Sequence, residues 1–255
     1  MARTPPGYII WEGASLIDGA PIVCIATGLG RKSKNAKTGA MVQTYILRKD
    51  VSPVDAVRSG EDASICGDCV HRSPDGFRGR TCYVTVGQGP RVVWEAMQRG
   101  VYPQATPEQI SEIAEGLGVR IGTYGDPAAV PAHVWVALVL RALFRTGYSH
   151  QWRTAVGRSL LGLVMASVDS PQEAREAQAL GWRTFRVTRD ASEPSVGKEV
   201  VCPASAEAGR KLTCAECKAC DGDTSRRASI RIAAHGSSSN AANLALLDDR
   251  LIARG

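Results

Sequence analysis

The sequence predicts an α/β fold whose mainly parallel sheet closes, fully or in part, into a TIM-like β/α barrel. From about residue 105 onward, short apolar runs alternate with helix signals, which is the spacing of strands joined by right-handed crossovers. The run in SLLGLVMASVDS is apolar without interruption, as in a strand buried on both faces. With 255 residues, 44% of them hydrophobic, the chain can bury a large core. An open doubly wound sheet is the alternative.

The first hundred residues predict two strands joined by a long basic loop. PIVCIATGL and MVQTYILRK have the composition of strands, and GRKSKNAKTGA lies between them. Cys24 stands among apolar neighbours in the first strand, so we expect a small buried thiol there. The cations of the loop would contact the phosphates of a nucleic acid, or would only keep a solvated loop polar. They are Arg31, Lys32, Lys34 and Lys37.

Two of the later helices are predicted by their capping signals. In TPEQISEIAEGLG, Thr106 is the expected N-cap and Gln109 closes a capping box; in SPQEAREAQALG, Ser170 and Glu173 take the same positions. A proline follows each cap at the first helical position. A third, largely buried helix is expected in AHVWVALVLRALFRTG. Strands are expected in VRIGTYGDP, YSHQW, SLLGLVMASVDS, WRTFRVTRD and SIRIAAHG.

Polar residues that follow these strands mark the expected site, because ligands of parallel α/β sheets bind at the carboxyl ends of the strands. Tyr124, Asp126 and His150 are the catalytic candidates, and Asp126 and Asp169 are candidates for binding a cofactor. The same positions have structural alternatives. Asp126 would cap a helix that begins near Pro127, and Asp169 would assist the next residue in capping. Two further residues follow strands: Arg189 and His235.

The late cysteines form the pattern C-P-x10-C-x2-C-x2-C. A C-x2-C-x2-C run with a remote cysteine beside proline favours iron–sulfur ligation, whereas structural zinc more often uses two separated C-x2-C knuckles. The segment between the last three cysteines has no large apolar residue to bury them. We therefore expect a four-cysteine metal site, with a [4Fe–4S] cluster ahead of zinc. Its ligands are Cys202, Cys214, Cys217 and Cys220.

A second group, in CGDCVHRSPDGFRGRTCY, consists of Cys66, Cys69 and Cys82. Three thiolates leave one coordination position for another group. Around zinc, His71 would be the fourth ligand. Around a second cubane cluster, one iron would face a substrate or cofactor.

Charge and compartment restrict the function without deciding it. The net charge of +6 and the isoelectric point near 9.0 are compatible with a polyanionic partner. No apolar run reaches the roughly 20 residues that a membrane span needs, and the start MARTPPGYII has no extended apolar region, so we expect a cytoplasmic protein. In a reducing cytosol, closely spaced cysteines are metal ligands more often than disulfide partners. G-x-S-x-G and G-x-x-x-x-G-K-[ST] motifs are absent, which argues against a serine hydrolase and a P-loop nucleotidase.

Taken together, CGDC…TCY, VRIGTYGDP, VMASVDS, GWRTFRV and the late cysteine segment resemble an uncharacterised group of phage and plasmid gene products related to proteins with a radical S-adenosylmethionine-like barrel. The resemblance covers roughly residues 8 to 236. It implies an iron–sulfur barrel in a bacterial host cell, with Tyr83 beside the third thiolate and S-adenosylmethionine as a cofactor. Radical S-adenosylmethionine enzymes use C-x3-C-x2-C, and this chain has C-x2-C-x12-C.

Residues 1–236 are expected to form one α/β domain with metal-binding loops at 66–82 and 202–220, followed by a tail or short helix at 237–255. Two functions remain open. The first is an iron–sulfur protein with one or two [4Fe–4S] clusters, acting on a nucleic acid or nucleotide if it is an enzyme. The second is a zinc-stabilised binding protein that contacts DNA or a host protein. The sequence indicates no oligomeric state.

Overall fold

The computed structural model describes residues 5–29, 38–190, 192–225, 228–234 and 241–252. The cations of the predicted phosphate-binding loop (Arg31, Lys32, Lys34 and Lys37) and the strand-end residue His235 lie outside these ranges.

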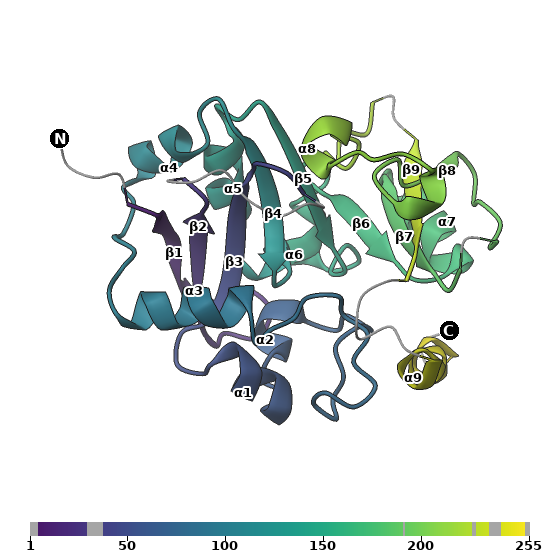
Figure 1. The fold of residues 1–255 in the computed structure, drawn as a ribbon, viewed down its shortest axis with the longest axis horizontal. Helices are drawn as coiled ribbons and strands as arrows, with labels where there is room; N and C mark the ends of the chain where they lie inside the picture. The colour runs from purple at the N-terminus through teal and green to yellow at the C-terminus, as the bar shows by residue number, and fades with distance from the viewer. Residues whose placement is uncertain (1–4, 30–37, 191, 226–227, 235–240, 253–255) are drawn as a thin grey trace.

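The described residues form one sheet of nine strands in the order β1-β2-β3-β4-β5-β6-β7-β9-β8 (Figure 1). The first three strands are antiparallel, and every pairing from β3 to β8 is parallel. The outer strands β1 and β8 do not pair, so the sheet is not closed and the predicted barrel is not confirmed. The strands are β1 Gly7–Ala14, β2 Pro21–Thr27, β3 Val42–Arg48, β4 Gly118–Tyr124, β5 Phe144–Ser149, β6 Met165–Val168, β7 Thr184–Thr188, β8 Glu199–Val201 and β9 Ser229–Ala233.

Helices accompany the sheet on both sides. Residues of α4, α5 and α7 pack with Ile121 of β4 and Val168 of β6 in the main core, while α1, α2 and α3 gather at one end of β1–β3 (Figure 1). The helices are α1 Pro53–Ser59, α2 Ala63–Cys66, α3 Gly89–Gln98, α4 Pro107–Ile113, α5 Ala132–Val139, α6 Ala155–Arg158, α7 Pro171–Ala179, α8 Cys214–Cys217 and α9 Ala241–Ile252, with 3-10 turns η1 Pro127–Ala129 and η2 Ala206–Ala208. None of the described helices has the length and apolar character that crossing a membrane requires.

The structure confirms the predicted helix caps, but one predicted helix is shorter than expected. Thr106 and Gln109 form the predicted capping box of α4. Ser170 caps α7, but the Glu173 carboxylate accepts from the backbone N–H of Asp169 at 2.8 Å rather than from that of Ser170. The predicted helix in AHVWVALVLRALFRTG ends at residue 139, and its last residues belong to β5. A continuous apolar run carries no period that separates helix from strand.

A second, smaller core lies on the opposite face of β6. Met165 contributes to it and the adjacent Ala166 to the main core, because neighbouring strand residues point to opposite faces. In this smaller core, Cys202 and Cys220 pack with Ile230 and Ile232 of β9. The apolar surroundings of the late cysteines therefore come from the strands rather than from their own segment.

The carboxyl ends of β4, β5 and β6 meet the loop that carries the first cysteine group. The backbone N–H of Asp126, after β4, donates to the Ile65 carbonyl at 2.6 Å. After β5, Gln151 Nε2 donates to Asp68 Oδ1 at 2.6 Å. This edge of the sheet is where the sequence placed the site, and the open topology leaves that placement unchanged.

Candidate metal centres

The first cysteine group is built on a tight turn at the end of α2. Cys66 is the last residue of this helix, and Gly67 follows with φ 59°, a conformation that favours glycine. A side chain at Gly67 would also collide with that of Gln151. In this turn the backbone N–H of Cys69 donates to the Cys66 carbonyl at 3.3 Å. The backbone N–H of Cys82 donates to the His71 carbonyl at 3.0 Å, which holds Cys82 beside the same loop.

The three thiols of this group lie close enough to influence one another's pKa values. Burial, with Asp62, Cys69 and Cys82 adding to it, raises the pKa of Cys66 well above its ordinary value. Burial also raises the pKa of Cys82. For Cys69, burial acts in the same direction, but the nearby His150 imidazole outweighs it and lowers the pKa. Among the described residues, no three cysteine sulfurs lie within 4.8 Å of one another, so no assembled thiolate site is present.

Two buried polar groups beside these thiols lack ordinary partners. Arg80 is 5% exposed and donates only to the carbonyls of Cys82 and Val84, at 3.1 and 3.0 Å. Within the described residues, its Nε has no hydrogen-bond partner and its guanidinium forms no salt bridge; Asp62 interacts with it electrostatically but pairs with Arg72. The Tyr124 hydroxyl, on a side chain 3% exposed, likewise has no hydrogen-bond partner in the described part of the chain.

Next to Cys69, two imidazoles converge on one carboxylate. His71 Nε2 lies 2.7 Å from Asp169 Oδ1, and His150 Nε2 lies 3.3 Å from Asp169 Oδ2. His150 Nε2 is also 3.8 Å from the Cys69 sulfur. A catalytic Cys-His-Asp triad would use both ring nitrogens of the histidine, whereas here one nitrogen faces both partners. The Asp169 side chain thus faces the imidazoles, while Ser170 is the N-cap of α7 and Asp169 assists there only through its backbone N–H.

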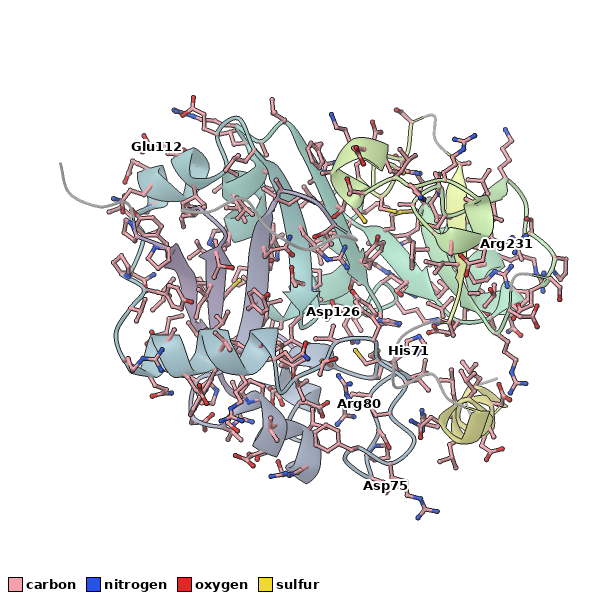
Figure 2. All side chains as sticks on the ribbon, viewed as in Figure 1. His71, Asp75, Arg80, Glu112, Asp126 and Arg231 are labelled. Atoms are coloured by element: carbon pink, nitrogen blue, oxygen red, sulfur yellow. The ribbon has the colours of Figure 1, made fainter. Side chains whose placement is uncertain are left out.

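Asp126 has the structural role that was its alternative. Its Oδ1 accepts from the Ala128 backbone N–H at 2.9 Å and from the Ser149 hydroxyl at 2.7 Å, and its Oδ2 accepts from the His150 backbone N–H at 2.7 Å. It caps η1 as expected and fixes the end of β5. Figure 2 shows Asp126 and His71 near the lower ends of the central strands, with Arg80 in the loop below them.

The second cysteine group lies on the face of the sheet. Cys202 follows β8 and donates its backbone N–H to the Arg231 carbonyl at 2.8 Å. Cys214 and Cys217 bound the short helix α8, which begins with a capping box, and Lys218 follows with φ 55°. The Cys220 carbonyl accepts from the Gly147 N–H of β5 at 3.2 Å. Four cysteines thus approach one region from the end of β8, from helix α8 and from the loop that follows α8.

The thiols of this second group also influence one another. The pKa of Cys220 is raised to about 12, first by burial and then by Cys202, Cys214 and Cys217. The Tyr148 hydroxyl opposes this rise by hydrogen bonding to the Cys220 sulfur.

A chain of contacts joins the two cysteine groups. Arg120 Nη2 donates to the Tyr83 hydroxyl at 2.6 Å, and Tyr83 directly follows Cys82. The same guanidinium lies over the Tyr148 ring, 5.6 Å from its centroid, and Tyr148 contacts Cys220. Arg120 is buried and has no carboxylate partner among the residues that the structure describes. Tyr83, predicted as a cofactor contact, is bound to Arg120 and half exposed.

Sequence reasoning named most of these residues but not their grouping. It considered His71 only as a zinc ligand with the cysteines, and it missed Thr81, Arg80 and Arg120. Thr81 Oγ1 lies 2.9 Å from His71 Nδ1, and no sequence motif marks it. Cys24 is fully buried, as predicted. Arg189 pairs with Asp248 of α9 at the exposed surface.

No family model, curated protein or solved structure that was compared with the chain matches it. The resemblance to phage and plasmid proteins therefore stays a prediction.

Proposed function

We propose that the chain is an iron–sulfur protein with two centres. A three-thiolate centre of Cys66, Cys69 and Cys82 lies at the carboxyl edge of the sheet, and a four-thiolate centre lies on its face. Each would hold a [4Fe–4S] cluster. The C-x2-C-x2-C run supports a cluster in the second group, which consists of Cys202, Cys214, Cys217 and Cys220.

The observation that carries the proposal is the buried guanidinium of Arg80. A buried charge is strongly unfavourable unless an opposite charge compensates it. Arg80 contacts two carbonyls and forms no salt bridge among the described residues, while the Asp62 carboxylate and the thiols of Cys66 and Cys82 are its electrostatic neighbours. Asp62 is already paired with Arg72. Thiolates that bind iron and sulfide form an anionic group, and that group would supply Arg80 with a counter-charge of its own. The unpartnered Tyr124 hydroxyl beside the same thiols would donate to it.

The reactive position would be at the three-thiolate centre. Four thiolates complete the coordination of a cubane cluster, whereas three leave one iron open to a substrate or small cofactor. The first ligand to test is S-adenosylmethionine, on the resemblance alone, and a nucleotide or nucleic acid is the proposed substrate class. Asp126 would contribute by holding His150 and the end of β5 in place rather than by contacting that ligand.

Metal analysis of anaerobically purified protein tests the proposal. We expect iron and acid-labile sulfide in equal amounts, about four of each per cluster. Cys66→Ser and Cys217→Ser should each remove roughly half of both, because they belong to different centres. Cys24→Ala, at a buried thiol in neither group, is the matched control and should keep the full content.

Stoichiometric zinc without sulfide, in protein never exposed to air, would refute the iron–sulfur proposal and leave the zinc-stabilised binding protein in its place. Electron paramagnetic resonance of the reduced protein then separates the two centres. Added S-adenosylmethionine should perturb the signal that Cys66→Ser removes and leave the other signal unchanged.

A further inference from the structure

Three ligand atoms converge beside the first cysteine group without involving a sulfur. They are Nε2 of His71, Nε2 of His150 and a carboxylate oxygen of Asp169, all within 4.8 Å of one another. They come from three segments: the loop after α2, the end of β5 and the end of β6. Among the described residues, this is the group of side chains whose ligand atoms lie close enough together to hold one metal ion.

We infer that His71, His150 and Asp169 bind one divalent first-row transition metal ion, Zn²⁺ or Fe²⁺ in class, at a site separate from the cysteine-bound clusters. Two imidazoles and one carboxylate are the protein ligands of many zinc and non-haem iron sites that keep open positions. Ligands about 2.1 Å from one tetrahedral ion lie about 3.4 Å apart. The separation of 3.3 Å between His150 Nε2 and Asp169 Oδ2 fits this distance. His71 Nε2 instead lies 2.7 Å from Asp169 Oδ1, and that hydrogen bond would lengthen as the ion replaces its proton.

The surroundings hold the ligands as a metal site requires. His71 Nδ1 is bound to Thr81 Oγ1 at 2.9 Å, which orients Nε2 toward Asp169, the usual arrangement around a metal-bound histidine. The His150 backbone is fixed by Asp126 at 2.7 Å. The Asp169 side chain is 2% exposed, and its Oδ2 accepts no well-formed hydrogen bond from the described residues; its neighbour there is His150 Nε2 at 3.3 Å. A cation bound between these two atoms would satisfy the buried carboxylate oxygen better than this long contact does.

Open coordination positions would face a small cavity. His71 and Asp169 line a space of about 30 Å³ together with residues of β7 and α9, among them Leu247. That volume is enough for a water molecule. An ion here would therefore carry a water or a small ligand. The site needs no sulfur, so Cys69 remains available to the three-thiolate centre.

Cobalt titration of the full-length protein tests the inference, with Co²⁺ as the probe. With both cysteine centres filled, we expect one additional Co²⁺ per chain with the visible absorption of nitrogen and oxygen ligands, and this ion should add no sulfur-to-cobalt charge-transfer band. His71→Gln and Asp169→Asn should weaken binding about 100-fold or more. Thr81→Val, which removes only the partner of His71, should weaken it about 10- to 100-fold. His133→Gln, at an exposed imidazole, is the matched control and should bind as the native chain does.

Cys66→Ser separates this inference from the proposed function. It should lower the iron and sulfide content and leave Co²⁺ binding unchanged. If the native chain contains no iron or sulfide, the cobalt site should still be present. Co²⁺ binding that survives both Asp169→Asn and His71→Gln, or that disappears in Cys66→Ser, would overturn the inference. Thermal melting of each variant shows that loss of binding is not loss of the fold.

Discussion

Replacing Asp126 by alanine should destabilise the protein and disturb the end of β5. The carboxylate is 6% exposed and accepts three hydrogen bonds of 2.7 to 2.9 Å, from Ala128, Ser149 and His150. Two of the donors are backbone N–H groups. Without Asp126 these amides lose their partner in the protein interior, and the backbone that carries His150 is no longer tied to the turn after β4.

The size of the effect follows from these contacts. Each buried donor left without a partner costs about 1–3 kcal/mol, so the three together cost about 3–9 kcal/mol. Part of this is recovered, because burial raises the pKa of Asp126 above its ordinary value despite the bonds from Ala128 and Ser149, and alanine removes that buried charge. A net loss of about 3 kcal/mol remains. For a chain of this size it lowers the melting temperature by about 6–12 °C.

Thermal melting of the native chain, Asp126→Ala and Asp126→Asn, all in the same metal state, measures this loss. Asparagine retains Oδ1 and loses mainly the bond to His150, so its melting temperature should fall between the other two. The alanine variant should also bind Co²⁺ more weakly, because His150 is displaced. An alanine variant that melts within about 2 °C of the native chain would show that the reasoning from these three bonds is wrong.

Three further outcomes are expected. Glu199→Ala should cost about 3–5 kcal/mol in urea unfolding, because the fully buried Glu199 is a principal partner of the buried Arg186. Cys217→Ser should lower the melting temperature, since metal binding contributes folding free energy. An iron chelator should lower the melting temperature of the native chain by a comparable amount, and it should have no further effect through the second centre of the variant. Arg189→Gln should change stability by less than about 1 kcal/mol, because its ion pair with Asp248 is largely exposed; a larger change would mean that α9 depends on this contact.

The local parts of the fold were predictable from the sequence. Capping at Thr106 and Ser170 depends on residues within four positions of the helix start, and both caps formed. The residues after β4, β5 and β6 were named as site candidates because parallel strands place their carboxyl ends at one edge. The strands β1 and β8 were not predicted: β1 mixes aliphatic, aromatic and polar residues, and β8 has only three residues.

The grouping of the site residues was not predictable in the same way. His71 and Asp169 are 98 positions apart, and their contact depends on how the loop after α2 folds across the sheet edge. Arg80 and Arg120 carry no motif, and their importance comes from being buried without a carboxylate. Only the three-dimensional arrangement shows that two cationic side chains face thiols.

The Arg120 contact chain has a thermodynamic consequence for the two cysteine groups. One guanidinium touches Tyr83, beside the first group, and Tyr148, which contacts the second. Arg120 is coupled electrostatically to Cys214 of the second group and reaches the first group through Tyr83, so under the proposed function we expect negative charge gained by one group to influence the other. By linkage, whatever the first group does to the second, the second does equally to the first. Arg120→Gln would remove this shared electrostatic interaction, and the occupancy of each cysteine group would then no longer depend on that of the other.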